Sequence, residues 1–126
     1  MIMENRFYNL TAYQEAKQLV LKVYSLMRLF PPCEQYALCD QLRRAVISIP
    51  SNIAEGMGRY SEKEQVHFLE IAYGSLMEVN SQLDIAKDLK YITQEQFTDA
   101  EQQIYRVASL VSGLRSKRVK TLAPSL

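Results

Sequence analysis

The sequence contains few of the residues from which metal centres and nucleophilic sites are built. Its 126 residues include one histidine, two cysteines and no tryptophan. Cys33 and Cys39 stand six positions apart, which does not place them on one helix face, and with the single His67 they form no metal-ligand cluster. No Ser-His-Asp or Cys-His arrangement is suggested by spacing. We therefore predict no metal, no cofactor and no catalytic residue, and we interpret His67 as an exposed surface residue.

Long apolar runs are also missing. No uninterrupted run approaches the ~20 residues that a membrane-spanning helix needs. The first ten residues, MIMENRFYNL, lack the basic start and apolar run of a secretory signal. With only two cysteines, the simplest interpretation is a cytoplasmic protein with free thiols and no membrane partner.

Glycine and proline are scarce, at four each, which favours helices over a turn-rich β fold. Apolar residues recur at alternating steps of three and four, the spacing of one helix face. This pattern predicts helices at about 11–29, 34–57, 61–89 and 93–116. The four predicted core stripes are Ala12, Ala16, Leu19, Val23, Leu26 and Phe30; Leu38, Leu42, Ala45, Ile49, Asn52 and Gly56; Leu69, Ala72, Leu76, Val79, Leu83 and Ala86; and Phe97, Ala100, Ile104, Val107, Val111 and Leu114.

The connections between the predicted helices are short and carry recognisable signals. Pro31-Pro32 ends the first helix, and Ser61 with Glu64 and Thr93 with Gln96 form capping boxes for the third and fourth. Short loops favour an all-α, antiparallel up-down-up-down four-helix bundle. We treat residues 1–126 as a single domain, with 1–10 as a lead-in and 117–126 as a flexible basic tail.

The second helix contains a proline in its middle, within RRAVISIPSNIAEGMGR (residues 43–59). Pro50 removes a backbone donor, but the apolar step from Ile49 to Ile53 is still four, so we favour one kinked helix over two helices. Gly56 and Gly58 are predicted to stop this helix, because glycine adopts the left-handed conformation cheaply.

Asn52 is a polar member of this apolar stripe, so it needs a hydrogen-bond partner if it is buried. Glu55, one turn on, or Glu78, on the next helix, could supply one. A structural polar motif of Asn52, Glu55, Ser75 and Glu78 that fixes helix register is the favoured interpretation. A ligand-binding or catalytic role and simple exposure at a frayed end remain the alternatives.

The third helix is too apolar for the surface of a monomer, because Tyr73 and Met77 widen its apolar surface beyond one stripe. We expect it to be both the central core helix and part of a subunit interface. Gly74-Ser75 leaves a shallow spot where another backbone could approach closely.

The charge of the chain is nearly balanced, at +1, but it is unevenly distributed. After Gly113 the chain carries four bases and no acid. The predicted phosphate-contacting residues are Arg43, Arg44, Arg115, Lys117, Arg118 and Lys120. Solvated charge for solubility is the alternative. Most of the eight tyrosines are interpreted as core-edge residues. Some could stack on bases, but no interleaved basic-aromatic strand pattern supports a single-strand recognition module.

The run LRRAVISIPSNIAEGMGRYSEKE and the later FLEIAYGSLMEVNSQLDIA resemble the bacterial four-helix-bundle proteins encoded in intervening sequences of large-subunit ribosomal RNA genes. The matching pieces are Ser48-Ile49-Pro50, the run from Asn52 to Gly56, Arg59, Gly74-Ser75 and Glu78. The resemblance extends more loosely from about Leu10 to Val111. It implies four-helix protomers that assemble into rings, commonly pentamers. It also implies a fold similar to the accessory protein of diversity-generating retroelements, a basic pentameric bundle that partners a reverse transcriptase and nucleic acid.

Residues and resemblance together predict a non-enzymatic assembly protein that binds RNA or DNA through basic residues of a homo-oligomer. The alternative is a structural or adaptor oligomer that binds another protein through the apolar face of helix three. An enzyme with a site in the bundle core is the third interpretation.

Overall fold

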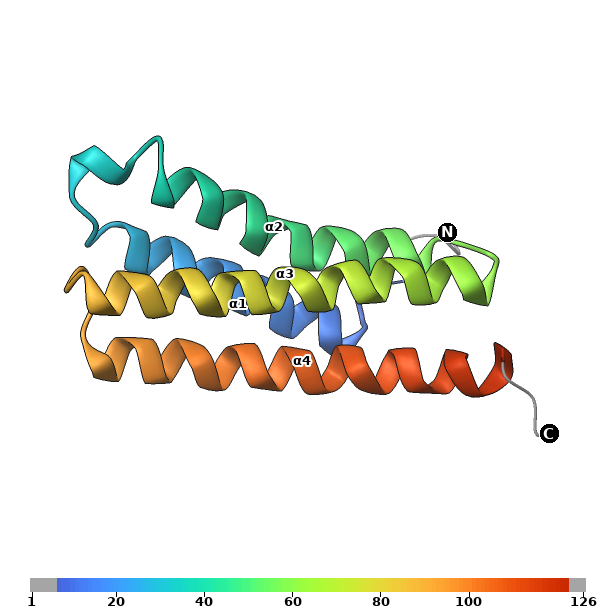
Figure 1. Ribbon diagram of the computed structural model, residues 1–126. Helices are drawn as coiled ribbons and strands as arrows, with labels where there is room; N and C mark the ends of the chain where they lie inside the picture. The colour runs from blue at the N-terminus through green and yellow to red at the C-terminus, as the bar shows by residue number, and fades with distance from the viewer. Residues whose placement is uncertain (1–6, 123–126) are drawn as a thin grey trace.

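The computed structural model describes residues 7–122, and in that range the chain forms four α-helices and no β-strand (Figure 1). The helices are α1 (Thr11–Met27), α2 (Leu38–Met57), α3 (Glu62–Asp88) and α4 (Gln94–Leu122). A short 3-10 helix, η2 (Pro32–Glu34), lies between α1 and α2. The all-α prediction is therefore confirmed.

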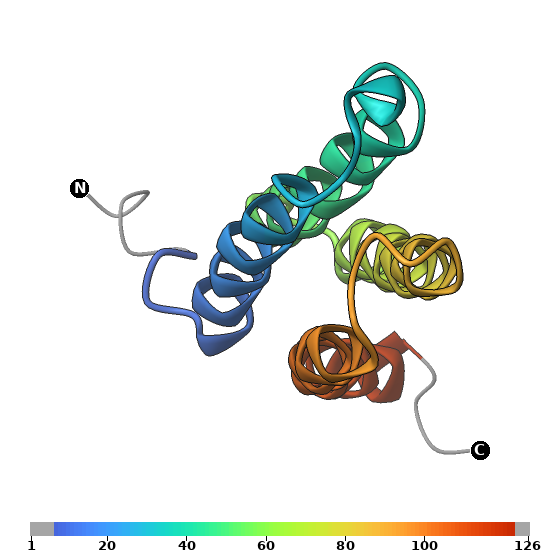
Figure 2. The same cartoon turned by 90° about the vertical axis from the view of Figure 1, so that its left-hand side faces the viewer.

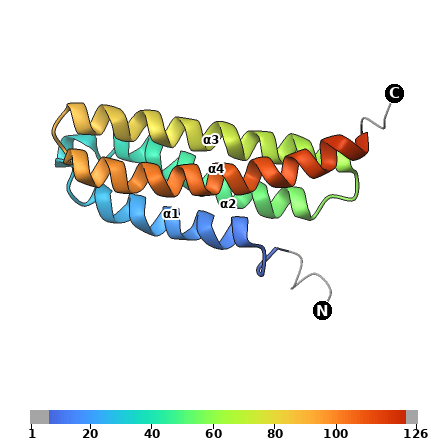
Figure 3. The same ribbon diagram turned by 90° about the horizontal axis from the view of Figure 1, so that it is seen from below.

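Each helix packs against two others. α2 contacts α1 and α3, and α4 contacts α3 and α1. Figure 2 looks nearly along α3 and α4, with α1 and α2 tilted across them, and Figure 3 shows α4 lying between α3 and α1. The core lies along the centre, where the four apolar stripes meet.

The predicted stripes form this core almost without exception. Every member is buried apart from Leu38, Asn52 and Leu114, which are half-buried. The stripe of α3 is fully buried along its whole length, which makes it the most completely buried of the four stripes. Spacing alone therefore identified the core, because a helix buries the face on which apolar residues recur.

The start of α2 differs from the prediction. The helix begins at Leu38 rather than at Glu34, because the backbone of Ala37 (φ −119°, ψ −98°) is not helical. The preceding residues form η2, which begins at Pro32, where proline's fixed φ suits the first turn. The Glu34 side chain accepts the Tyr91 hydroxyl at 2.7 Å and so connects this segment to the α3–α4 connection.

Pro50 lies inside α2, and the helix continues past it to Met57. One helix, rather than two, is therefore present. The helix ends at Gly58 as predicted, but the reason given was wrong: Gly58 has right-handed backbone angles (φ −86°, ψ −7°), and no described glycine has a positive φ.

Gly56 is buried within α2 and has a different role from a helix stop. A Cβ placed there would lie 3.2 Å from Cβ of Phe68 and 3.4 Å from the carbonyl oxygen of Gln65. The glycine therefore permits the close approach of α2 and α3.

The two capping boxes are present to different degrees. Ser61 Oγ accepts the backbone N–H of Glu64 at 3.3 Å. At the second box, Thr93 Oγ1 accepts the N–H of Gln96 at 3.1 Å and Gln96 Oε1 accepts the N–H of Thr93 at 2.9 Å. Both orphan donors at the start of α4 are thereby satisfied.

The predicted end of the fourth helix near Ser116 is wrong. α4 continues to Leu122, so residues 117–122, which we expected in a flexible tail, are helical. Residues 123–126 and 1–6 lie outside the described residues. From the lead-in, Phe7 and Leu10 pack against the core, whereas Tyr8 is exposed. None of the described helices is both long enough and apolar enough to span a bilayer.

Candidate nucleic-acid interface

The basic end of α4 presents two kinds of side chain. Lys117 and Lys120 are exposed, and their ammonium groups have no ion-pair partner within residues 7–122. Arg115 instead donates from Nε to Glu70 Oε2 at 2.7 Å, which binds α4 to α3. Lys117 and Lys120 are three positions apart on one helix and therefore point to the same side.

Arg118 is held against the bundle. Its Nε donates to Gln65 Oε1 at 2.8 Å, its Nη1 donates to the Leu114 carbonyl at 2.8 Å, and its Nη2 lies 3.5 Å from the Met57 sulfur. Gln65 also donates from Nε2 to the Arg59 carbonyl at 2.7 Å. Gln65 thus joins the end of α4 to the turn between α2 and α3.

The predicted Arg43-Arg44 pair lies in a different place. Both arginines are near the start of α2, which is at one end of the molecule, whereas α4 ends at the other (Figure 1). Arg43 donates to the Gln35 carbonyl at 2.9 Å, and both guanidinium groups lie within ion-pair distance of Asp40, at 3.7 and 3.4 Å. The six predicted phosphate contacts therefore form two separate groups.

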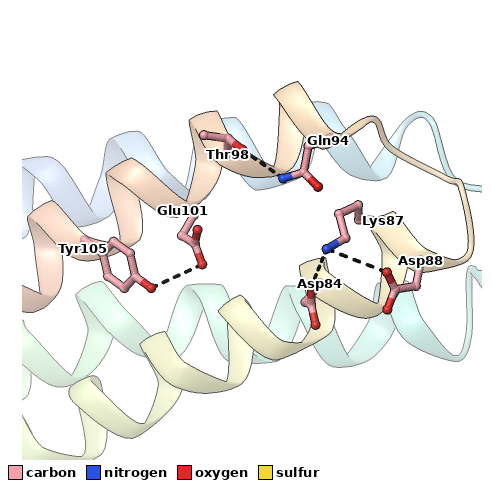
Figure 4. Close-up of polar contacts among 7 residues, drawn as sticks. All are labelled: Asp84, Lys87, Asp88, Gln94, Thr98, Glu101 and Tyr105. Atoms are coloured by element: carbon pink, nitrogen blue, oxygen red, sulfur yellow. Dashed lines mark hydrogen bonds and ion pairs between the residues drawn. The ribbon is translucent and has the colours of Figure 1, made fainter.

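The end of the bundle near Arg43 carries a cleft of about 720 Å³, lined in part by Lys87, Asp88 and Tyr91. One lysine of the cleft is engaged: Lys87 Nζ lies 2.8 Å from Asp84 and 3.7 Å from Asp88 (Figure 4). Lys90, which also lines the cleft, is exposed. The hydrogen bond to Asp84 is the main cause that raises the pKa of Lys87. In the same region Tyr91, bonded to Glu34, has its pKa raised to about 12. The cleft at this end is therefore lined by one paired lysine, Lys87, and one exposed lysine, Lys90.

Figure 4 also shows two hydrogen bonds between polar side chains of α4. Gln94 Nε2 donates to Thr98 Oγ1 at 3.1 Å, and the Tyr105 hydroxyl donates to Glu101 Oε2 at 3.3 Å.

The predicted polar motif is only partly assembled. Asn52 Nδ2 donates to the Ser48 carbonyl at 2.8 Å and to Ser48 Oγ at 2.9 Å. Ser48 Oγ lies 2.9 Å from Ser75 Oγ, so a hydrogen-bonded chain joins α2 to α3. The predicted partners of Asn52 were wrong, because the amide turns back to the residue four positions earlier on its own helix.

Glu55 and Glu78 are both exposed and engage other groups. Glu55 accepts from Arg59 at 3.2 Å, and Glu78 accepts from Gln82 Nε2 at 3.2 Å. Gln82 was not predicted as a polar contact; its side chain is buried and also donates to Gln41 Oε1 at 3.3 Å. Gln82 lies seven positions after Ser75, so both are on one face of α3. This spacing could have indicated that Gln82 makes a buried polar contact.

The turn between α2 and α3 is a site that sequence reasoning missed. A cleft of about 580 Å³ there is lined by Arg59, Ser61, Lys63, Glu64, His67 and Phe68. The Arg59 guanidinium lies 4.8 Å from the centre of the Phe68 ring, and its Nε is buried with no hydrogen-bond partner among the described residues. His67 is exposed, as predicted, and its ring makes an edge contact with Phe68 at 5.3 Å between centroids.

Two tyrosines are far more exposed than core-edge residues would be. Tyr60, in this turn, is 94% exposed, and Tyr36, between η2 and α2, is 85% exposed. These two are exceptions to the interpretation that most of the tyrosines lie at the edge of the core.

The thiols lie in unlike surroundings. Cys33 and Cys39 are both free, the first exposed and the second buried. Burial raises the pKa of the Cys39 thiol. Within residues 7–122, no group of three or more His, Cys, Asp and Glu side chains is arranged so as to hold a metal ion.

Comparison with known proteins gives a consistent picture. The model of the 23S rRNA-intervening sequence protein family matches residues 8–113, and a comparison with curated proteins found no match. A crystal structure of a protein of unknown function from the S23 ribosomal protein family of Bacteroides thetaiotaomicron is similar, with a TM-score of 0.76 and 20% sequence identity. The similarity covers 83% of this chain and 98% of that one. It supports the four-helix fold, and neither description names an enzymatic activity.

Proposed function

The chain belongs to the 23S rRNA-intervening sequence protein family, and from this premise we propose that it is a non-enzymatic assembly protein that binds nucleic acid through basic residues. The observation that carries the proposal is the basic end of α4. Its four bases lie on a helical segment without an acid, and two of them, Lys117 and Lys120, have exposed side chains on one side of the helix. Such a surface attracts phosphates without reading base sequence.

The residues of this surface have distinct roles in the proposal. Lys117 and Lys120 make the main phosphate contacts. Arg115 and Arg118 position the helix end, because they are bonded to Glu70 and Gln65. Arg43 and Arg44 form a second, weaker contact at the opposite end, since Asp40 lies beside both.

We further propose that the protomer is an antiparallel up-down-up-down bundle with a kink at Pro50, acting in the cytoplasm as a ring-like homo-oligomer. Exposed Ile71, Tyr73 and Met77 on α3 support an interface, because apolar groups gain stability when covered. Beside them, Gly74 has no atom within 4 Å of where a Cβ would stand, which leaves room for a neighbouring backbone. Five subunits is the number that the resemblance implies, and a ring would multiply the charge of each α4 end.

The proposal is tested by neutralising the exposed lysines. Lys117→Gln with Lys120→Gln is expected to weaken binding to RNA and DNA about equally. It should reduce the slope of log affinity against log salt by roughly 1.5 per binding protomer, because two phosphate contacts are lost. Fluorescence anisotropy with labelled strands at several salt concentrations measures both quantities.

The matched control is Arg44→Gln, which removes a charge at the opposite end; its side chain is 81% exposed but lies 3.4 Å from Asp40. A smaller effect than that of the lysine pair is expected. If the wild-type protein binds nucleic acid and the lysine variant shows the same affinity and the same salt slope, the end of α4 is not the phosphate-binding surface.

A second candidate function is a structural or adaptor oligomer that binds another protein. The exposed apolar side chains of α3 favour it as well, because the same surface could receive a partner helix. Met77→Glu separates the two uses: loss of self-assembly alone favours the homo-oligomer, whereas intact assembly with loss of a stoichiometric, nuclease-resistant protein partner favours the adaptor.

A further inference from the structure

The α2–α3 turn carries a highly exposed tyrosine, Tyr60, and the residues on either side of it in the sequence, Arg59 and Ser61, line a cleft. Tyr60 is 94% exposed, and it directly follows Arg59 in the turn. Arg59, Lys63 and His67 line the same cleft of about 580 Å³. Lys63 and His67 are four positions apart on α3 and therefore lie on one face of the helix.

From this geometry we propose that the turn is a binding site for single-stranded nucleic acid, with Tyr60 stacking on an unpaired base and Arg59 and Lys63 contacting the flanking phosphates. The inference rests on the proposed function and specifies where an unpaired strand would bind. An aromatic face beside a basic track is the arrangement that single-strand binding uses, because every base has a face on which it can stack. A base within a duplex is already stacked and cannot use the ring.

The two basic side chains of this site differ in whether they already have an ion-pair partner. The guanidinium of Arg59 is held between Glu55, at 3.2 Å, and the Phe68 ring, which fixes its position at the wall of the cleft. Lys63 is exposed and has no ion-pair partner within residues 7–122. Glu64 is the one acid among the residues that line this cleft.

The site is continuous with the basic end of α4. Figures 1 and 3 both show the α2–α3 connection and the end of α4 at the same end of the molecule. Gln65 links them directly, because it accepts from Arg118 and donates to the Arg59 carbonyl. Arg118 is therefore the basic residue of α4 that lies next to this turn.

Charge distribution favours this end over the other. Residues 55–70 and 113–122 together hold six Lys and Arg against four acids, whereas the rest of the chain holds nine against ten. The larger cleft at the opposite end is lined by Lys87, which is paired with Asp84 and Asp88, and by exposed Lys90. Tyr36, also highly exposed, lies near the start of α2, where Asp40 faces both arginines.

The test compares Tyr60→Ala with Tyr36→Ala, a matched exposed tyrosine at the other end. Anisotropy is measured with labelled poly-uridine and poly-thymidine strands of about 20 nucleotides and with a duplex of the same length, at several salt concentrations. Tyr60→Ala is expected to weaken single-strand binding by about tenfold with the salt slope unchanged, and to leave duplex binding unaltered. Lys63→Gln is expected to lower the slope by about 0.8.

Each result has a distinct meaning. If Tyr60→Ala loses the same affinity for RNA and for DNA strands, the ring acts by base stacking alone. If affinity is lost only for RNA, the ring also recognises the 2′-hydroxyl. If wild-type protein binds strands with a clear salt slope but Tyr60→Ala behaves like Tyr36→Ala, the site is wrong and the proposed function stands. If wild-type protein binds neither strand nor duplex at low salt, the proposed function fails and this inference fails with it. Circular dichroism of each variant verifies the fold.

Discussion

At the scale of single residues, Gly56 shows how a missing side chain sets the distance between two helices. The sequence pattern had suggested a helix-ending glycine, yet the residue is buried within α2 and faces Phe68 and Gln65 of α3. The nearest atoms are a Cβ and a backbone oxygen, which cannot move away without shifting the helix itself. Close packing, rather than backbone freedom, is therefore the reason for glycine here.

Gly56→Ala is predicted to lower the free energy of unfolding by about 1 kcal/mol, because crowding against α3 outweighs the gain in helix propensity. Gly113→Ala is the matched control, since Gly113 is also helical but has no atom within 4 Å of a Cβ. It should raise stability by about 0.5–1 kcal/mol. Urea denaturation of both variants measures the difference, and equal effects would contradict the close-approach explanation.

The Asn52 network marks the limit of residue-level prediction. That Asn52 needs a partner followed from its place in an apolar stripe. Which partner it has did not follow, because an amide in a helix can turn toward its own helix or toward a neighbour. The bond to Ser48, four positions earlier, was a local option, but the link to Ser75 depends on how α2 and α3 are placed against each other.

At the scale of elements, the end of α4 is held by contacts that no local pattern contains. Arg118 reaches Gln65 and Met57, which lie more than fifty positions earlier in the chain. Basic residues near the end of a helix also interact favourably with its dipole. These contacts explain why the helix continues to Leu122, although the sequence of its last turns predicts a flexible tail.

Arg118→Ala is predicted to lower the free energy of unfolding by about 1 kcal/mol, because hydrogen bonds to Gln65 and to the Leu114 carbonyl are lost. Lys117→Ala, next to it but exposed, should change stability by less than about 0.5 kcal/mol. Thermal denaturation of both variants provides the comparison. Arg118→Lys should not restore the loss, since an ammonium group cannot reproduce the planar guanidinium contacts; a full rescue by lysine would count against this role.

Helix existence was predictable and helix boundaries were less so, for physical reasons. Periodicity identified all four helices, and the cap at Thr93 placed the start of α4 within a residue. The start of α2 was missed because residues 34–37 have ordinary helix-compatible composition, and only the backbone turn at Ala37 separates them from the helix.

At the scale of the whole molecule, the arrangement of charge separates residues that the sequence had grouped. Arg43 and Arg44 belong to one end, and the α4 bases belong to the other, together with Arg59 and Lys63. Sequence alone could not reveal this, because charge runs were counted along the chain and not across the bundle. The turn containing Tyr60 was missed for the same reason: its basic neighbours are assembled from a turn, a helix start and a helix end. The structural kinship with the accessory protein of diversity-generating retroelements stays a prediction.

The most direct test of the account is the salt dependence of binding by nuclease-treated, full-length protein to a labelled single-stranded RNA, with light scattering on the same sample. We predict a homo-oligomer whose log affinity falls linearly with log salt, with a slope steeper than about −2, because several protomers contribute phosphate contacts. A well-defined oligomer that binds no RNA or DNA at low salt would contradict the central claim and leave the apolar surface of α3, as a site for a protein partner, the better explanation.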